Sequence, residues 1–353
     1  MSESAKVVRI ATRPRRTRRR STAAAALDEP LRDRLRRLEA ELARTREALD
    51  RQAEAKARPE ALLVTLAKVV NAGLSGVTWE SLARLQRDLY FAWHSEEVDD
   101  FGLDPRFAET IRPFFEFLYT VWWRVETSGI EHVPATGAAL LVANHSGVLP
   151  YDGMMVKLAL QHNHPARREC RMLALDMFAL LPFLAPMLAK NGEIRANPEN
   201  AERVLQRGEL VGVFPEGVKG VGKYYRTRYK LARFGRGGFV RVALRTGAPL
   251  IPCAVVGAEE IHPVVAKADW FGRPFGFPYF PITPTFPVLG LLGLVPLPSK
   301  WSIDFGDPLP VDRYGPDGAE DPILVNRLAE QMRSTIQKMI DGRLARRHSV
   351  WFG

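Results

Sequence analysis

A histidine and an aspartate lie seven residues apart in the stretch Val142-Ala-Asn-His-Ser-Gly-Val-Leu-Pro-Tyr-Asp-Gly153. An imidazole can take the proton of a hydroxyl group, and a carboxylate that binds one ring nitrogen leaves the other free to act as the base. His145 follows an apolar run typical of a buried strand, and Asp152 precedes a helical pattern. A strand-to-helix turn would bring the carboxylate back to the imidazole. Histidines followed by an aspartate are common, so the surrounding segments decide what this pair means.

A second segment with polar chemistry, Phe214-Pro-Glu-Gly217, follows another strand-like run that begins at Leu210. Ligand sites of α/β proteins lie at the carboxyl ends of the strands, which is where His145 and Glu216 both fall. We therefore expect the two segments to belong to one site.

In these two segments the chain resembles the glycerolipid acyltransferase family, of the type that acts on 1-acylglycerol 3-phosphate. The family's first block is Asn-His, four residues and Asp, whereas this chain has Asn144-His145, six residues and Asp152. The longer spacing looks like the variant block of acyltransferases related to neutral-lipid synthesis. The resemblance covers about residues 129–310. It implies that His145 deprotonates the acceptor hydroxyl and that Asp152 orients His145.

The family's other blocks have counterparts here. Arg195 matches the arginine of the second block, although a surface salt bridge is the alternative explanation for it. The third block ends in arginine in the family and in Lys219 here, which keeps the charge and loses the bidentate fork. The resemblance implies that Arg195 and Lys219 hold the acceptor's head group, that Glu216 and Gly217 form the floor of the site, and that 249–256 shapes the acyl site.

The resemblance implies an O-acyltransferase that moves a fatty acyl group from acyl-coenzyme A or acyl carrier protein to a glycerolipid hydroxyl, in phospholipid or glycerolipid biosynthesis. It implies no cofactor, no metal and no covalent enzyme intermediate. Lysophosphatidate is the first acceptor we expect, because Arg195 and Lys219 supply positive charge for a phosphate. The long His-to-Asp spacing favours mono- or diacylglycerol instead. A non-catalytic lipid-binding membrane protein of the same fold is a third interpretation.

Other kinds of site are disfavoured by what their motifs lack. Gly217 to Lys223 has the spacing of a phosphate-binding loop, but Tyr224 stands where a hydroxyl must reach magnesium. His162-Asn-His164 near Cys170 has no fourth ligand at a sensible spacing for a metal. No Gly-x-Ser-x-Gly sequence is present, which argues against a serine hydrolase.

The elements expected to carry these residues alternate between strand and helix. Strands are predicted over 138–143, 171–175, 210–214, 249–257 and 301–306, and helices over 153–161, 177–189, 199–207, 238–245 and from Asp321 as the cap to Gly342. This alternation predicts an α/β fold with a central mixed, largely parallel sheet flanked by helices, together with an N-terminal helical extension. We expect the α/β domain to span 105–320 and a C-terminal helix and tail to follow at 321–353. An aromatic helix over 107–125 packs either in the core or at a membrane interface.

The charge of the chain is concentrated at its start. Residues 1–21 hold eight basic residues against Glu3, which is +7 of the chain's net +10. We predict a disordered basic tail over 1–27 that is drawn to anionic lipid, with no specific nucleic-acid partner. Residues 28–104 are predicted to form a helical extension, in which leucines over 31–49 suit self-association through a coiled coil as well as a bundle helix.

An apolar segment over 271–298 is interrupted by seven prolines and therefore cannot be one membrane-spanning helix. It is either a hydrophobic lid or hairpin that touches lipid, or a loop over the core. The two cysteines suit a reducing compartment, and no secretory signal is apparent. We expect a cytoplasmic protein that is peripheral on the inner face of the cell membrane.

Overall fold

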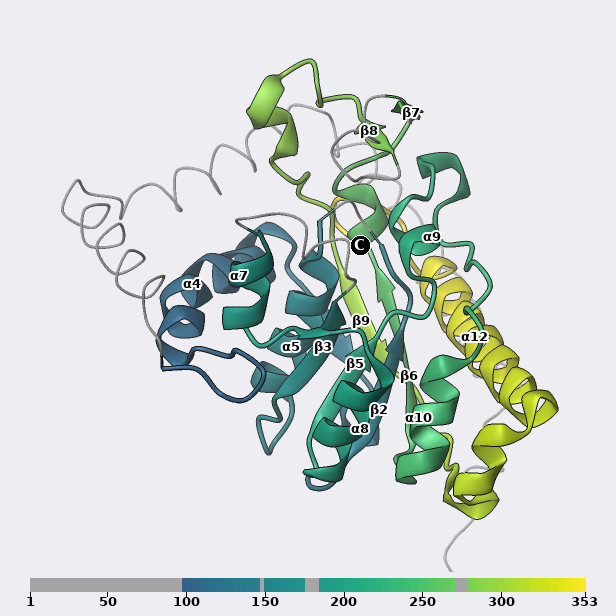
Figure 1. The fold of residues 1–353 in the computed structure, drawn as a ribbon. Coiled ribbons are helices and arrows are strands. Elements are labelled where there is room, and N and C mark those ends of the chain that lie inside the picture. The colour runs from purple at the N-terminus through teal and green to yellow at the C-terminus, as the bar shows by residue number, and fades with distance from the viewer. Residues whose placement is uncertain (1–96, 147–148, 175–183, 269, 271–278) are drawn as a thin grey trace, which may run out of the picture. The chain divides into compact units, whose positions relative to one another are not determined.

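The computed structural model describes residues 97–353 except 147–148, 175–183, 269 and 271–278 (Figure 1). The predicted basic tail, the helical extension up to residue 96 and the coiled coil at 31–49 lie outside the described residues. So do parts of the predicted helix over 177–189 and of the apolar segment over 271–298.

A seven-stranded sheet forms the centre of the described part of the chain, with the strand order β1-β9-β6-β2-β5-β3-β4. Its strands are β1 (Glu126–Ser128), β2 (Ala139–Ala143), β3 (Cys170–Ala174), β4 (Ile194–Arg195), β5 (Leu210–Val213), β6 (Leu250–Val256) and β9 (Ser302–Phe305). All neighbouring pairs are parallel except β6 and β9. The mixed, largely parallel α/β sheet predicted from the sequence is confirmed.

Helices cover both faces of this sheet. The α-helices of the described residues are α4 (Pro105–Phe117), α5 (Tyr151–Asn163), α7 (Leu184–Lys190), α8 (Pro198–Gln206), α9 (Val218–Val221), α10 (Gly238–Thr246) and α12 (Pro322–Leu344). Alternate residues of a strand point to opposite faces, and β2 shows the consequence: Leu140 belongs to the core under α8, α10 and α12, and Leu141 to the core under α4 and α5. Every residue of β2 and β6 is buried, as expected for strands covered on both sides.

The C-terminal helix α12 begins as predicted. The Asp321 side chain accepts hydrogen bonds from the backbone N–H groups of Ile323 (2.8 Å) and Leu324 (3.2 Å), and Pro322 occupies the first helical position. The helix runs two residues past Gly342, where we predicted its end. Its buried residues, among them Ile336, join the core that contains α10 and β6. The helix α12 therefore packs in the same core as the sheet, and the boundary at residue 321 stays a prediction.

The aromatic segment after residue 105 packs mainly in the core. The helix α4 passes into a π-helix over Leu118–Trp122, and Trp123 is fully buried against Trp301, with ring centroids 4.5 Å apart. The indole N–H of Trp123 donates to the carbonyl oxygen of Leu297 (3.0 Å). The side chains of Phe115 and Tyr119 are buried as well, whereas Phe114 is exposed.

Beyond β6 the chain forms an excursion before it returns in β9. This excursion contains a two-stranded ribbon of β7 (Ala266–Ala268) and β8 (Phe280–Ile282) and a 3-10 helix over Gly290–Leu294. Within the described part of the chain, no helix combines the length and the hydropathy that crossing a bilayer requires.

Candidate active site

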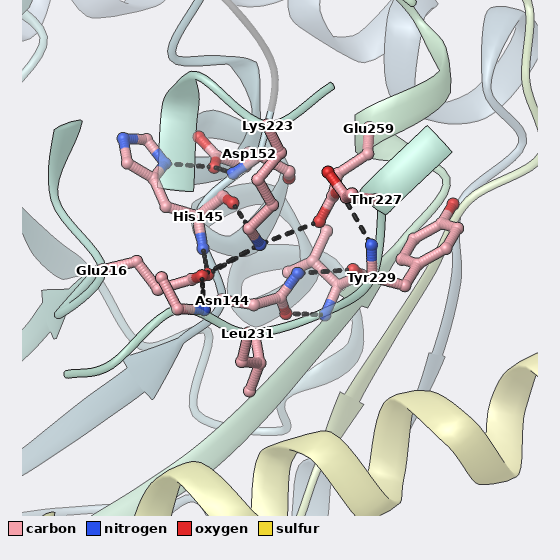
Figure 2. A network of polar contacts seen from close by, with 12 residues as sticks. Asn144, His145, Asp152, Glu216, Lys223, Thr227, Tyr229, Leu231 and Glu259 are labelled. Atoms are coloured by element: carbon pink, nitrogen blue, oxygen red, sulfur yellow. Dashed lines mark hydrogen bonds and ion pairs between the residues drawn. The ribbon is translucent and has the colours of Figure 1, made fainter. Parts of the chain in front are cut away.

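His145 and Asp152 are in direct contact. The Nδ1 atom of His145, two residues beyond the end of β2, lies 2.7 Å from Oδ2 of Asp152, the second residue of α5 (Figure 2). The Asp152 carboxylate also accepts from the backbone N–H groups of Ser146 (3.0 Å) and Gly153 (2.9 Å). With a carboxylate oxygen as its partner, Nδ1 of the neutral imidazole carries the proton and Nε2 is the basic nitrogen. The six-residue spacing thus closes the predicted turn.

Asn144 fixes the point at which β2 ends. Its side-chain amide donates to the carbonyl oxygen of Val255 (2.9 Å) and accepts from the backbone N–H of Val255 (2.7 Å), so it pairs with β6 as a backbone amide would. The residue is completely buried. Asn144 was not predicted as a site residue, and its only signal in the sequence is its place directly before the histidine.

The imidazole of His145 faces a small cavity. Its ring stacks on Phe214 with centroids 4.5 Å apart and an interplanar angle of 20°. A cavity of about 60 Å³ is lined by these two residues, Asp152, Glu193 and apolar side chains that include Met172. Burial raises the pKa of Glu193 above its ordinary value. His145 therefore borders a largely apolar cavity that is also lined by a second carboxyl group, that of Glu193.

Glu216 binds protein groups rather than facing the cavity. It follows β5 and is 4% exposed. One carboxylate oxygen accepts from the backbone N–H of His145 (3.1 Å), and the other from that of Ala232 (2.6 Å). Lys223 Nζ lies 3.0 Å from the same carboxylate. Glu216 thus braces the loop that follows β2. Its carboxylate lies on the side of His145 away from the cavity.

Lys223 and Glu259 complete a buried network that the sequence analysis did not find (Figure 2). Besides Glu216, the Lys223 ammonium group contacts Oε1 of Glu259 at 3.1 Å and approaches the carbonyl oxygen of His145 at 3.5 Å. The other oxygen of Glu259 accepts from the backbone N–H of Tyr229 (2.9 Å). Burial raises the pKa of Glu259 to about 7, although Lys223 acts in the opposite direction. The only sequence signal was the lysine at the end of the disfavoured phosphate-loop match.

Gly217 and the short helix α9 bring the third block against His145. Gly217 has φ +55°, a conformation that favours glycine, and its N–H donates to the carbonyl oxygen of Phe214 (3.0 Å) to close the turn. A Cβ atom on Gly220 would lie 2.7 Å from Cβ of His145, so the backbone of α9 is in close contact with the loop that follows β2. Lys219 lies on the exposed side of this helix.

Arg195 is the exposed last residue of β4. It pairs in register with Ala174 of β3, and both Ala174 and the following Ala196 line the cavity beside His145. The structure thus brings His145, Asp152, Glu216 and Gly217 together and leaves the side chains of Arg195 and Lys219 in contact with solvent. Among the described residues, no group of three or more His, Cys, Asp or Glu side chains is arranged to hold a metal ion.

Comparisons with known proteins bear on the family of this chain. A family model described as Acyltransferase matches residues 124–256, which include both the histidine block and the Pro-Glu-Gly block. An uncharacterized protein of Mycobacterium tuberculosis is 50% identical over 257 residues, which are 72% of this chain and 72% of the mycobacterial one. A bovine protein named "DGAT1/2-independent enzyme synthesizing storage lipids" is 26% identical over 238 residues, 66% of this chain and 64% of its own.

Among solved structures, the chain is similar to the 1-acyl-sn-glycerophosphate (LPA) acyltransferase PlsC of Thermotoga maritima. The TM-score is 0.46 and the identity 17%, with 82% of this chain and 97% of that chain covered.

Proposed function

We propose that this chain, which belongs to the acyltransferase family, moves a fatty acyl group from a thioester donor to a glycerolipid hydroxyl. Acyl-coenzyme A and acyl carrier protein are the donors considered. The observation that carries the proposal is the 2.7 Å contact between His145 and Asp152 beside a cavity. It supplies a general base with its tautomer fixed, which is what the activation of an alcohol requires.

The reaction follows from the two nitrogens of His145. Its Nδ1–H donates to Asp152, and Nε2 takes the proton from the acceptor hydroxyl as the oxygen attacks the thioester carbonyl carbon. The new C–O ester bond forms and the C–S bond breaks. The imidazolium then returns its proton from Nε2 to the departing thiolate. The carboxylate of Asp152 stabilises the imidazolium between these steps, and no acyl-enzyme intermediate forms.

Lysophosphatidate is the acceptor we propose first. Arg195 and Lys219 are exposed cationic residues on segments that adjoin the cavity and His145, which suits a phosphate that remains at the surface while the hydroxyl reaches the base. A neutral lipid alcohol is the second candidate. It is favoured by the six residues between His145 and Asp152 and by the similarity to the bovine protein named for the synthesis of storage lipids.

The purified protein tests this proposal directly. We would incubate it with labelled acyl-coenzyme A or acyl carrier protein and with lysophosphatidate, monoacylglycerol or diacylglycerol, and identify each product by mass. Turnover of lysophosphatidate would support the first acceptor, and turnover of the neutral alcohols alone would support the second. Lipid binding without any product would mean that the chain is a non-catalytic lipid-binding protein.

His145→Ala is the matched variant. We expect it to abolish turnover and to leave the thermal unfolding transition nearly unchanged, because the ring lies at the rim of a cavity. His162→Ala is the control, since His162 also lies in α5 next to a carboxylate, Glu116, but is partly exposed and lines no part of this cavity. If His145→Ala unfolds the protein, or retains turnover, the histidine is not the base.

We also propose that the protein works as a peripheral protein on the inner, cytoplasmic face of the cell membrane. The support is an apolar surface on the excursion between β6 and β9, where Val288, Leu289, Leu292 and Val295 are exposed. A lipid acceptor would be reached there without leaving the bilayer surface.

A further inference from the structure

Lys223 is a buried lysine next to the catalytic histidine, and nothing in the reaction above uses it. Its side chain is 9% exposed, and the two carboxylates it contacts, Glu216 and Glu259, are exposed by 0% and 4%. A lysine this deep must be paired, because an ammonium group without partners would lose its hydration uncompensated. Here one ammonium group faces two carboxylates from different parts of the chain.

The contacts of Lys223 converge on the backbone of His145. Its ammonium group approaches the carbonyl oxygen of His145 directly, and it binds Glu216, whose carboxylate accepts the backbone N–H of the same histidine. Both polar backbone groups of His145 therefore depend on one lysine (Figure 2). On its other side Lys223 reaches Glu259 in the 3-10 helix Ala258–Glu260, which directly follows β6. The lysine thus ties the ends of β2, β5 and β6 together.

We propose that Lys223 is a positioning residue for acyl transfer: it fixes the backbone of His145 opposite the contact with Asp152, and it neutralises the carboxylates behind the imidazole. The inference rests on the proposed function, because a position matters only if His145 acts as a base. Asp152 sets the rotation and the tautomer of the imidazole ring, and Lys223 sets the position of the His145 backbone that carries the ring. Misplacement of a catalytic group by about 1 Å can lower a rate a hundredfold.

The charge of Lys223 also bears on the protonation of the base. The titratable groups that face His145 are Asp152 from α5, Glu193 across the cavity, and Glu216 and Lys223 below it, with Glu259 behind Lys223. Lys157 pairs with Glu193 (3.4 Å), and Lys223 is the cation that approaches the carbonyl oxygen of His145. Its removal leaves negative charge that favours the protonated imidazole, so the acid limb of the pH–rate profile should move to higher pH.

The experiment uses the full-length protein and three variants of this network. Lys223→Met removes the charge and the contacts, Lys223→Arg keeps the charge, and Lys223→Met with Glu259→Gln removes the lysine together with one of the carboxylates that it neutralises. We would measure kcat and KM for the acceptor from pH 5 to 9, well below each variant's thermal transition. Lys190→Met is the control, because Lys190 is a similarly buried lysine whose partner Asp104 is fully buried, at a place with no contact to His145.

We expect Lys223→Met to lower kcat about 10- to 100-fold with KM changed less than threefold, and to move the acid limb up by roughly half a pH unit to one unit. Lys223→Arg should recover most of the pH profile and part of kcat. The double variant should recover thermal stability and keep the low kcat, whereas Lys190→Met should lose stability and keep kcat.

A purely structural lysine gives a different pattern. If folded Lys223→Met has the wild-type kcat and pH profile, or if the double variant regains kcat along with stability, the inference is overturned. Wild-type protein without turnover on any acceptor would instead refute the proposed function, so the two failures are distinguishable.

Discussion

His145 lies between two carboxylates that act on different parts of it. Asp152 binds the ring, and Glu216 binds the backbone N–H. The difference follows from position, because Asp152 opens a helix whose first turn points back at the imidazole, while Glu216 lies in a tight turn beneath it. Neighbouring carboxylates often take separate roles in this way when their surroundings differ. Here Asp152 binds the ring that the proposed reaction uses as the base, and Glu216 braces the backbone that carries this ring.

At the same scale, Glu259 makes stability depend on pH. Its folded-state pKa of about 7 lies above its ordinary value of 4.5, so the folded protein binds this proton more tightly than the unfolded chain. The stabilisation is fully present below about pH 4.5 and is lost as the pH rises through about 7. We expect the free energy of unfolding of wild type, relative to Glu259→Gln, to fall by roughly 2–3 kcal/mol between pH 5 and pH 8.

Urea titrations of wild type and Glu259→Gln at each pH would measure this difference. The pKa of Glu193 is also raised by burial, but Glu193 is present in both proteins. Its contribution to the pH dependence therefore drops out of the difference between their free energies of unfolding. If the free energies of unfolding of the two proteins change with pH in the same way, the pKa of Glu259 is not raised in the folded protein.

At the scale of elements, the sequence predicted the strands and helices that carry long, bounded apolar patterns. The strands β2, β5 and β6 were found within a residue or two, and α12 was found with its Asp321 cap, because each has an apolar pattern and clear boundary residues. The strands β1 and β4 were missed. They contain only three and two residues and are defined by their neighbours β9 and β3 rather than by a pattern of their own.

The residues of the site also divide into those that the sequence predicted and those that it did not. His145, Asp152 and Glu216 were predictable because they lie in short motifs that carry their own spacing. The pairing of Lys223 with Glu259 joins residues 36 positions apart, and it depends on how β6 ends next to α9. A lysine and a glutamate at that separation are unremarkable in a sequence, since only the tertiary structure makes them buried.

The contact between α9 and the end of β2 gives a prediction about packing. A methyl group on Gly220 would lie 2.7 Å from Cβ of His145 and 2.8 Å from Cβ of Glu216, so one of these backbones must shift. We expect Gly220→Ala to cost about 1–3 kcal/mol of stability and to lower kcat about tenfold, because the shift moves the base. Thermal unfolding and steady-state kinetics measure the two effects.

The control for this substitution is Gly342→Ala. A Cβ at Gly342 meets no atom within 4 Å, and the residue lies in the exposed last turns of α12, so alanine should raise stability by about 0.5–1 kcal/mol and leave kcat unchanged. Wild-type kinetics in Gly220→Ala would mean that α9 does not position His145.

For the α/β domain as a whole, the topology places the base and the excursion at one edge of the sheet. The strands β2, β5 and β6 are parallel, so their carboxyl ends, and hence His145 and Glu216, lie at the same edge. The chain leaves β6 at this edge and returns antiparallel in β9, so the described residues between them extend from the edge that bears His145 (Figure 1). The amino end of α12, which follows β9 and the turns after it, belongs to the opposite edge.

The excursion is built in a way that suits contact with lipid. Several of its described backbone N–H groups are bonded internally, for example Leu289 N–H to the carbonyl oxygen of Thr285 (2.8 Å) and Val295 N–H to that of Leu292 (3.2 Å). A segment that enters the apolar part of a bilayer needs such internal pairing, because no water is available there. The exposed fractions of Val288 and Leu292 are 82% and 74%, which leaves their apolar area unburied in water.

The last prediction concerns this surface. We expect wild type to float with vesicles of anionic phospholipid, and Val288→Glu with Leu292→Glu to lower the vesicle-bound fraction at least tenfold, because each substitution removes about 1.5–3 kcal/mol of apolar burial and adds a charge. Turnover of a detergent-dispersed acceptor should be unchanged, since neither residue lines the cavity beside His145. Ile323→Glu is the control, because Ile323 is 79% exposed at the amino end of α12 and belongs to the opposite edge of the sheet. The competing explanation is that this surface is an interface between two copies of the chain, and light scattering after size-exclusion chromatography tests it. The lipid site is refuted if three results occur together: wild type is a dimer, the double variant is a monomer, and the two bind vesicles equally.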